Sequence, residues 1–582
     1  MASPAPTRSR SAARFAADHP RYKWVALSNT TLGVLMATIN SSIVIISLPA
    51  IFRGIRLDPL GPGNVSYLLW MIMGFLVVSA VLVVTLGRLG DIYGRVRVYN
   101  LGFAVFAAAS VFLSVDPLHG EPGALWLIIG RIVQGIGGAM LFANSAAILT
   151  DAFPSSQRGM ALGINQVAAI AGSFLGLLIG GLLSEWDWRA VFWVSVPIGI
   201  FGAVWSYMSL HELGQRHSAK LDIPGNVTFG VGLTALLVAI TYGIQPYGGH
   251  AMGWTNPWVV GGLVGGALLL VAFCIIETKV EQPMFSMSLF RLRPFWTGNL
   301  AGLLAAIGRG GMQFMLIIWL QGIWLPLHGY DYASTPLWAG IYLLPLTIGF
   351  LVAGPAAGWL SDRFGARALS TGGLLVVTAT FAGFLFLPVN FTYWQFALLL
   401  AVNGIGSGLF SAPNTTAIMN SVPANQRGAA SGMGGTVLNS GMALSIGVFF
   451  SLMIAGLAAT LPRTLFHGLT GQGVGAGIAH QIANLPPVGS LFAAFLGYNP
   501  IQSLLAPTGA LARLPAANQA TLTGKGFFPH LMTAPFHHGL VIVFSAAALM
   551  TLVGAFFSSI RGRRYVYVDE PYDTSAEGLV RA

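Results

Sequence analysis

Residues 87–97 read GRLGDIYGRVR, and the pattern returns in altered form as GWLSDRFGAR at residues 358–367. Both copies follow a long apolar segment, and both place a glycine, an acid and a second glycine at the same offsets. These positions are Gly87, Asp91 and Gly94 in the first copy and Gly358, Asp362 and Gly365 in the second. A charged, tight turn between two apolar segments, repeated about half a chain apart, predicts a membrane transporter built from two related halves.

The composition of the chain favours a lipid-facing surface. Of the 582 residues, 55% are hydrophobic and only 8% are charged, whereas soluble domains carry roughly 25% charged residues. The net charge of +11 would suggest nucleic acid as a partner in a soluble protein. Here the bases lie in short loops and tails between apolar runs, so we interpret them as a topology signal and expect no nucleic-acid partner.

The single cysteine, Cys274, excludes an internal disulfide and a cysteine-rich metal site. A basic N-terminal tail leads directly into a full-length span, so we expect no cleavable signal peptide.

The apolar runs predict membrane-spanning helices, because a span needs about 20 mostly apolar residues. We expect fourteen spans, at residues 24–51, 65–86, 98–115, 124–149, 160–183, 190–209, 223–245, 257–276, 295–320, 335–356, 368–387, 394–418, 429–457 and 538–560. Lys and Arg concentrate in alternate loops and in both tails. By the positive-inside rule, we expect both termini to be cytoplasmic. We expect the protein to lie in the plasma membrane.

The two turn motifs each follow the second span of a six-span set, which leaves one pair of spans between the sets. The predicted fold is all-α and polytopic, with two six-helix bundles and two inserted helices. The predicted domains are the tail 1–23, the bundle 24–209, the insert 210–294, the bundle 295–560 and the tail 561–582. Residues 458–537 form an extracellular segment of the second bundle, for which we weigh short helices on the outer face equally against a flexible linker.

The repeated turn resembles the loop between the second and third helices of the major facilitator superfamily. The resemblance implies a cytoplasmic gate that opens and closes between two transport states. Its candidate residues are Gly87, Asp91, Gly94, Arg95, Arg97, Gly358, Asp362, Arg363, Gly365 and Arg367. Ile92 stands where the family usually has a base, and Ala366 stands where the first copy has Arg95.

The fourth span carries an arginine in the run Arg131 to Gly138, RIVQGIGG. An arginine within a span costs at least about 2.5 kcal/mol on insertion scales, so it is usually partnered. The run resembles the superfamily's fourth-helix motif, whose arginine is tied to proton coupling. We therefore take Arg131, Gln134 and Asp91 as coupling candidates. The alternative is an arginine that extends to the nearer membrane surface.

Glycines recur at four-residue spacing in the fifth span, where Gly172, Gly176, Gly180 and Gly181 predict close helix packing. The run resembles the antiporter motif of drug exporters, although Leu177 stands where that motif has proline.

The sixth span opens with WDWRAVFWVSVPIG at residues 186–199. That string is similar to one in the fourteen-span drug:proton antiporter family, and the span count agrees with it independently.

The first span departs from the family. Residues 39–49, INSSIVIISLP, align with a motif that normally has aspartate at the second position, where this chain has Asn40. An amide cannot titrate, so it cannot carry a proton. No carboxylate lies in the middle of any predicted span, and the embedded charges are Arg131 and Arg309. Because a cation would lack compensation there, we expect a neutral or anionic cargo. The substrate-pathway candidates are Asn40, Asn165, Gln166, Arg309, Gln313, Gln321, Asn414 and Asn439.

The function we predict is secondary active transport, with proton-coupled efflux of small amphipathic drugs or metabolites implied by the resemblance. An alternative is export of an endogenous lipid-like or secondary-metabolite product without carboxylate-based coupling. A membrane-embedded enzyme would need a cluster of His, Asp or Glu at one depth, and a sensor would need an appended soluble domain; the sequence has neither. We expect no enzymatic activity, no cofactor and no metal. The expected partners are the lipid bilayer, a small-molecule substrate and protons.

Overall fold

The described residues form fourteen helical segments that are long and apolar enough to cross a membrane. The computed structural model describes residues 19–562 except 59, 60, 62, 155, 156, 214–221, 282, 284, 424, 425 and 498. The predicted tails therefore lie largely outside the described residues, as does the middle of the loop that leads into the insert. The fourteen-span, all-helical prediction is confirmed.

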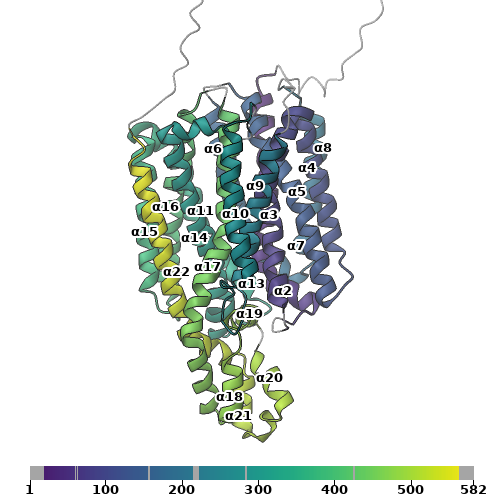
Figure 1. Cartoon of the computed structure of the whole chain (residues 1–582), viewed down its shortest axis with the longest axis vertical. Coiled ribbons are helices and arrows are strands. Elements are labelled where there is room, and N and C mark those ends of the chain that lie inside the picture. The colour runs from purple at the N-terminus through teal and green to yellow at the C-terminus, as the bar shows by residue number, and fades with distance from the viewer. Residues whose placement is uncertain are drawn as a thin grey trace, which may run out of the picture.

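The N-terminal bundle contains six spans that pack mainly on one another. Its helices are α2 (Tyr22–Ile55), α3 (Asn64–Tyr93), α4 (Arg95–Ser114), α5 (Gly120–Ala152), α6 (Arg158–Trp186) and the pair α7 (Ala190–Trp193) and α8 (Ser195–Ser209). Figure 1 shows α2, α3, α4, α5 and α8 grouped together, purple to blue.

The C-terminal bundle repeats this plan with two spans that are divided into segments. Its helices are α11 (Arg293–Trp319), which continues through the π-helical turn η2 (Leu320–Trp324) and α12 (Leu325–Leu327), then α13 (Thr335–Tyr342), α14 (Leu344–Phe364), α15 (Ala366–Leu385), α16 (Tyr393–Asn420), α17 (Arg427–Gly471) and α22 (Phe527–Ser559). One divided span is made of α11, η2 and α12, and the other of α13 and α14. A 3-10 turn, η1 (Met287–Arg291), precedes α11.

Two inserted helices, α9 (Ile223–Gly243) and α10 (Pro257–Glu277), pair with each other between the bundles. In the most apolar part of α10 only 17% of the residues are buried inside the protein. Its exposed side chains are apolar, including Val264, Leu268 and Val271. An apolar helix with so little protein cover is suited to lie against lipid.

The connection between α17 and α22 differs in length from the prediction. Helix α17 continues to Gly471, beyond the predicted end at residue 457, and α22 begins at Phe527, before the predicted start at residue 538. Both helices are therefore longer than the predicted spans. Short helices fill the rest: α18 (Ala476–Ala483), α19 (Pro487–Phe495), α20 (Pro500–Leu505) and α21 (Ala516–Thr523), with 3-10 turns η4 (Ala506–Thr508) and η5 (Leu511–Arg513). In Figure 1, α18, α20 and α21 stand outside the bundle. Of the two alternatives, short helices are confirmed.

Because the number of spans is even, the start of α2 and the end of α22 lie at one face, which we call the terminal face. The opposite face, with α18 to α21, is the distal face. The distal face is closed where the two bundles meet. A Cβ on Gly181 of α6 would lie 2.5 Å from the carbonyl oxygen of Pro336 in α13, and the Gln321 amide donates to the Ile46 carbonyl oxygen over 3.1 Å.

Helix α19 adds a second layer to this closure. Its residues Leu491 to Phe495 are at most 2% exposed. The helix packs against α3 of one bundle and against α17, α22 and η2 of the other. The Phe492 ring stacks on Phe450 with centroids 5.2 Å apart. The apolar run in the outer segment is therefore buried at the junction of the bundles.

Candidate functional site

A central cavity lies between the two bundles and has about 180 Å³ of free volume. Its deepest lining residues lie near mid-membrane, in the middle part of the membrane-spanning segments of their helices. They are Thr38, Ser173, Arg309 and Met442. Other lining residues, such as Met419, lie close to the terminal-face ends. The cavity thus extends from the terminal face towards mid-membrane, while the distal face is closed. It has the form of a transporter that is open to one side.

Both bundles contribute polar groups to the cavity wall. Among the predicted pathway residues, the wall contains Asn165, Gln166, Arg309, Asn414 and Asn439. The Asn165 amide donates to the Ser145 hydroxyl over 2.9 Å. A smaller compartment of about 50 Å³ continues the cavity towards α15 and α22, and shares Gln166, Arg309 and Asn414 with it.

Three predicted pathway residues lie outside this cavity. Asn40 is fully buried and contacts Arg131 instead. Gln313 is 5% exposed on α11 and is absent from the cavity lining. Gln321 belongs to the contact between the bundles at the distal face. Sequence alone cannot separate them from the cavity residues, because a polar residue in an apolar helix looks the same whichever way it faces.

Arg309 is half-buried in the cavity wall without an acidic partner. Its Nη2 atom lies 4.0 Å from the Met442 sulfur, and no ion pair of Arg309 is found among the described residues. Of the described residues that line the cavity, Arg309 is the one that carries a formal charge. The site therefore presents a net positive charge in a mostly apolar and amide-lined space.

Arg131 is buried within the N-terminal bundle and does not extend to a membrane surface. It is 1% exposed. It donates to the Asn40 side-chain oxygen, to Gln134 Oε1 over 2.7 Å and to the Met71 carbonyl oxygen over 3.3 Å. Its guanidinium also lies over the Phe75 ring, 4.6 Å from the centroid. Neutral acceptors thus hold this cation, whereas the motif that the first span resembles has aspartate at the position of Asn40.

The Arg131 contacts extend into two further helices. The Gln134 amide donates to the Ser110 hydroxyl over 2.8 Å, and the Asn40 amide donates to the Ser195 hydroxyl over 3.1 Å. The chain of contacts links α2, α4, α5 and α8. The described members of this chain contain no group that would release a proton near neutral pH.

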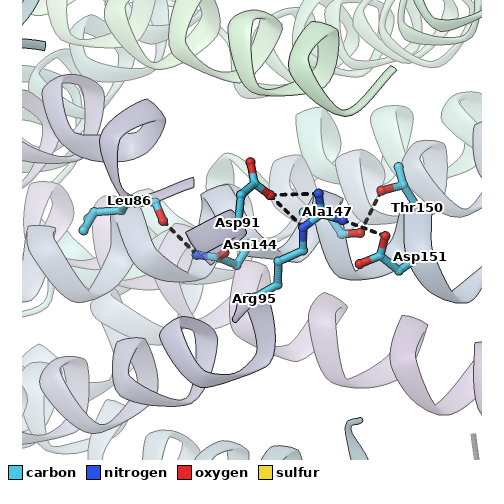
Figure 2. Close-up of polar contacts among 7 residues, drawn as sticks. All are labelled: Leu86, Asp91, Arg95, Asn144, Ala147, Thr150 and Asp151. Carbon is cyan, nitrogen blue, oxygen red and sulfur yellow. Dashed lines mark hydrogen bonds and ion pairs between the residues drawn. The ribbon is translucent and has the colours of Figure 1, made fainter. Parts of the chain in front are cut away.

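The first turn motif forms an ion-pair cluster at the terminal face (Figure 2). Arg95 pairs with Asp91 over 2.8 Å and with Asp151 of α5 over 2.6 Å. Gly90 packs on Asn144, whose amide donates to the Leu86 carbonyl oxygen over 3.4 Å. These contacts join α3, α4 and α5 of one bundle, so in this conformation they do not connect the two bundles. Asp151 was not predicted as a site residue, although it is an acid near a helix end.

The second turn repeats the backbone of the first but shows a different environment. A single glycine separates the helices in both copies, with φ of 114° at Gly94 and 82° at Gly365. A side chain would be strained at either angle, which explains both glycines. Arg363 lies over the Trp359 ring at 5.4 Å, and Arg367 is exposed. The Asp362 side chain lies outside the described part of the chain.

The remaining gate candidates lie at the same face. The backbone N–H of Arg97 donates to Glu212 over 3.0 Å. A Cβ atom on Gly87 or on Gly358 would have no backbone atom of another segment within 4 Å, so these two positions have room for a small side chain.

The glycine series of α6 faces two different helices. Gly172, Gly176 and Gly180 lie against α2, where a Cβ would come within 3.1 Å of the carbonyl oxygens of Leu35, Ile39 and Ile43, respectively. Gly181 instead faces α13 of the other bundle. On the α13 side, a Cβ on Gly340 would lie 3.0 Å from the Leu177 carbonyl oxygen. The same glycine-rich segment thus contributes both to packing within a bundle and to the distal closure.

One charged residue next to the cavity was not predicted as a site residue. Arg561 was assigned to the cytoplasmic tail, but it is only 4% exposed and donates to the Asn414 side-chain oxygen. The sequence signal was weak, because bases directly after a span normally remain in water.

Comparisons with known proteins agree with this architecture. The family model of the Major Facilitator Superfamily matches residues 30–446. The riboflavin transporter RibZ of Clostridioides difficile is 27% identical over 442 residues, which cover 75% of this chain and 90% of that protein. The tetracenomycin C resistance and export protein of Streptomyces glaucescens is 26% identical over 534 residues, or 91% of this chain and 90% of that one.

Among solved structures, an inward-facing, unoccupied bacterial homologue of the human lysosomal transporter Spinster aligns with a TM-score of 0.54. It is 16% identical and covers 95% of this chain and all of that chain, which supports the fold. With the family model spanning most of the chain, fourteen spans and two bundles around a central cavity, the chain belongs to the Major Facilitator Superfamily and is a membrane transporter.

Proposed function

We propose that this protein is a secondary active exporter of small amphipathic compounds, with neutral or anionic molecules favoured as cargo. The observation that carries the proposal is the cavity wall, which combines apolar side chains and amides with one arginine, Arg309, and no carboxylate among the described lining residues. A half-buried cation with no ion pair among the described residues favours a negative group nearby, because the low dielectric of the interior strengthens the attraction. The same field disfavours a cationic molecule.

Export follows from the relatives rather than from the geometry. Two relatives are named for the transport of riboflavin and the export of tetracenomycin C, both small organic molecules. We place the terminal face in the cytoplasm on the distribution of Lys and Arg, which makes the described conformation inward-open. Cargo would enter from the cytoplasm or the inner leaflet, and the bundles would rock to release it outside.

The gate residues of the two turn motifs would rearrange during this cycle. In the proposed outward-open state, the terminal-face ends of the bundles meet, and the Asp91–Arg95–Asp151 cluster comes close to the C-terminal bundle. The cluster would then exchange contacts within its own bundle for contacts between bundles. Such an exchange would couple closure of the cytoplasmic side to the charges of this cluster.

Proton coupling is the second part of the proposal, and Asn40 restricts where it can occur. Because the partner of Arg131 is an amide, the proton site would be a carboxylate at the terminal face, with Asp91 the first candidate. Arg131 and Gln134 would then have a positioning role. The alternative is export of an endogenous lipid-like product without carboxylate-based coupling. It is favoured by the amide-lined cavity and by Asn40.

The test is efflux from membrane vesicles that contain the protein, measured with and without a protonophore. The probes are a lipophilic cation, a neutral dye and an organic anion. We expect transport of the neutral or anionic probe, loss of transport with the protonophore, and selective loss of anion transport in Arg309→Gln. Arg309→Lys should retain part of the anion transport.

The matched control is Arg463→Gln, which removes the same charge at an exposed position on the distal part of α17. Strong transport of the cation by the wild type would contradict the cargo assignment. Unchanged anion transport in both Arg309 variants would refute the role of Arg309. Protonophore-insensitive transport would favour the alternative without proton coupling.

A further inference from the structure

The smaller compartment that continues the central cavity, called the side compartment below, is lined by an ordered set of polar groups. It lies among α11, α15, α16 and α22, and Gln166 of α6 joins its wall from the N-terminal bundle. On α16, every fourth residue belongs to this wall: Asn403, Ser407, Ser411 and Thr415. Residues at this spacing share one face of a helix, so the four side chains form a polar row along the compartment.

Two hydroxyls of this row have hydrogen-bonding capacity that the protein leaves unused. Ser407 and Ser411 are half-buried, and their hydroxyls make no hydrogen bond with any described residue. Neither oxygen is among the fully buried polar atoms that lack a partner, so both are in contact with free space. Each hydroxyl can donate one hydrogen bond and accept two.

Asn403 adds an acceptor whose orientation is fixed by its neighbour. Its amide nitrogen donates to Thr380 Oγ1 over 2.7 Å, and Thr380 Oγ1 donates to the Val377 carbonyl oxygen over 2.7 Å. Because the threonine proton is already used, its oxygen accepts, which places the nitrogen of the amide and not its oxygen on this side. Asn403 Oδ1 has no hydrogen-bond partner among the described residues and is not fully buried, so it is available to a group in the compartment.

The rest of the wall is mostly apolar and carries one charge. Val377 and Phe381 of α15 face the compartment. The Thr551 hydroxyl of α22 is already paired with Thr378 over 2.9 Å. Of the described residues that line the compartment, Arg309 is the one with a formal charge, and it lines the central cavity as well. The polar row therefore offers neutral hydrogen bonds within an apolar wall, next to a positive charge.

The free volume of the side compartment limits what can enter it. This volume is about 50 Å³, and an ordered water needs roughly 10–15 Å³. The compartment has room for on the order of four water molecules, or for a substituent of a few heavy atoms. The central cavity, with about 180 Å³, would hold the rest of the molecule. A substituent that displaces the waters must replace their hydrogen bonds, since affinity is otherwise lost.

We infer that the side compartment determines the specificity of the transporter, and that Asn403, Ser407 and Ser411 select cargo with an uncharged hydroxyl or carbonyl substituent. The inference rests on the proposed function and deepens it by naming a neutral group of the cargo. A site with open polar atoms rejects an analogue that lacks the hydrogen-bonding group, because its own polar atoms are then left unpaired. An apolar substituent of the same size is therefore disfavoured in this compartment.

The charge and the neutral substituent of the cargo would be recognised by different residues. Arg309 attracts an anionic group, whereas the polar row contacts the substituent. Neighbouring members of the row are about 6 Å apart along the helix, at 1.5 Å per residue. One hydroxyl of the cargo can therefore contact both Ser407 and Ser411, so the two serines are tested together.

The test measures equilibrium binding of three matched probes to the purified full chain in a neutral detergent. The probes are naphthoate and its hydroxy and methyl derivatives, both substituted at the same ring position. They share the ring system and the carboxylate, and the hydroxyl and methyl groups are nearly equal in size. We expect the wild type to bind the hydroxy probe about fivefold more tightly than naphthoate, as one net hydrogen bond would give. The methyl probe should bind least tightly.

The double variant Ser407→Ala with Ser411→Ala should reduce the preference for the hydroxy probe to about twofold or less. Because these hydroxyls make no hydrogen bond within the described protein, the variant should keep the melting temperature of the wild type. The matched control is Thr416→Ala. It removes a hydroxyl from the same helix that donates to the Ala412 carbonyl oxygen over 3.1 Å and lines neither space. This control should retain the full preference.

Equal affinities of the three probes in the wild type would overturn the inference and leave the side compartment as a space for water. A preference that persists in the double variant, or that is lost in Thr416→Ala, would overturn the assignment to the polar row. Arg309→Gln should weaken binding of all three probes alike and leave the preference in place.

Failure of this inference differs from failure of the proposed function. Equal affinities together with anion efflux by the wild type would overturn this inference alone. Absence of anion efflux would instead refute the anionic cargo. The uncharged counterparts naphthalene, naphthol and methylnaphthalene would then decide the inference, with the same preference for the hydroxyl expected and equal binding overturning it.

Discussion

Substitution of Gly181 by alanine should shift the protein away from the conformation described here. The new Cβ would lie 2.5 Å from the Pro336 carbonyl oxygen and 2.8 Å from the Leu337 Cα atom. That oxygen would be about 0.9 Å too close for ordinary van der Waals contact. Backbone atoms cannot rotate away as a side chain can, so α6 and α13 must separate. The two helices belong to different bundles, so their separation opens the distal face.

The size of the shift can be estimated from the cost of overpacking. Such insertions typically cost about 1–3 kcal/mol. Because the cost falls on the distally closed state and not on the open one, the equilibrium between them should change by roughly 5–150-fold. Gly181→Leu should give a larger effect. Gly163→Ala is the matched control, since it lies on the same helix and a Cβ there meets nothing within 4 Å.

The assay is double electron–electron resonance between two spin labels at the distal face. Trp186→Cys at the end of α6 and Ala333→Cys before α13 provide the sites, in a Cys274→Ser background that removes the single native cysteine. Gly181→Ala should increase the population of long distances, and Gly163→Ala should match the parent. The reasoning is refuted if Gly181→Leu leaves the distance distribution unchanged in a folded protein.

Two further predictions concern the buried arginine and the outer segment. Asn40→Ala removes a side-chain acceptor of Arg131 and should lower the free energy of unfolding by roughly 1.5–3 kcal/mol, as for other hydrogen bonds to charged groups. Ser195→Ala is the control, because it removes only the hydrogen bond between the Asn40 amide and the Ser195 hydroxyl. Equal melting temperatures of the two variants would contradict the prediction. At the distal face, Lys525 donates to Asp331 over 2.7 Å, and this contact lowers the pKa of Asp331. The contact should persist above the ordinary aspartate pKa of about 3.9 and weaken as the pH falls through the lowered value. Hydrogen-exchange protection around Tyr332 and Lys525, relative to the intrinsic exchange rate at each pH, should fall only at acidic pH, and Asp331→Asn should remove that dependence.

The membrane architecture could be predicted from sequence because lipid imposes a strong local rule. Every span must satisfy its backbone hydrogen bonds internally and present apolar side chains, so apolar length predicts helices directly. The two turns could be predicted because each needs a glycine at a backbone angle that other residues rarely adopt, as at Gly94 and Gly365.

Features that depend on neighbours were harder to predict. Hydropathy reports where a helix meets lipid and not where it ends, so the extension of α17 to Gly471 was missed. The positions of Asn40 and Gln321 away from the cavity depend on which way their helices face. Arg561 was missed because its burial arises from the packing of α11, α16 and α22, and nothing adjacent in the chain indicates it. The partnering of Arg131 could be anticipated, since an arginine in a span requires it.

The unbroken length of α17 has a mechanical consequence. The helix carries the cavity residues Ser431 and Met442 in the half that begins at the terminal face, and its other end contacts α18. Its 45 residues extend about 67 Å, so a tilt of about 5° at the cavity end displaces the far end by about 6 Å. The helix would transmit a small tilt within the membrane to the short helices at the distal face. A binder raised against α18 and α21 should therefore recognise one state of the transport cycle and hold it from the distal face, without entering the cavity.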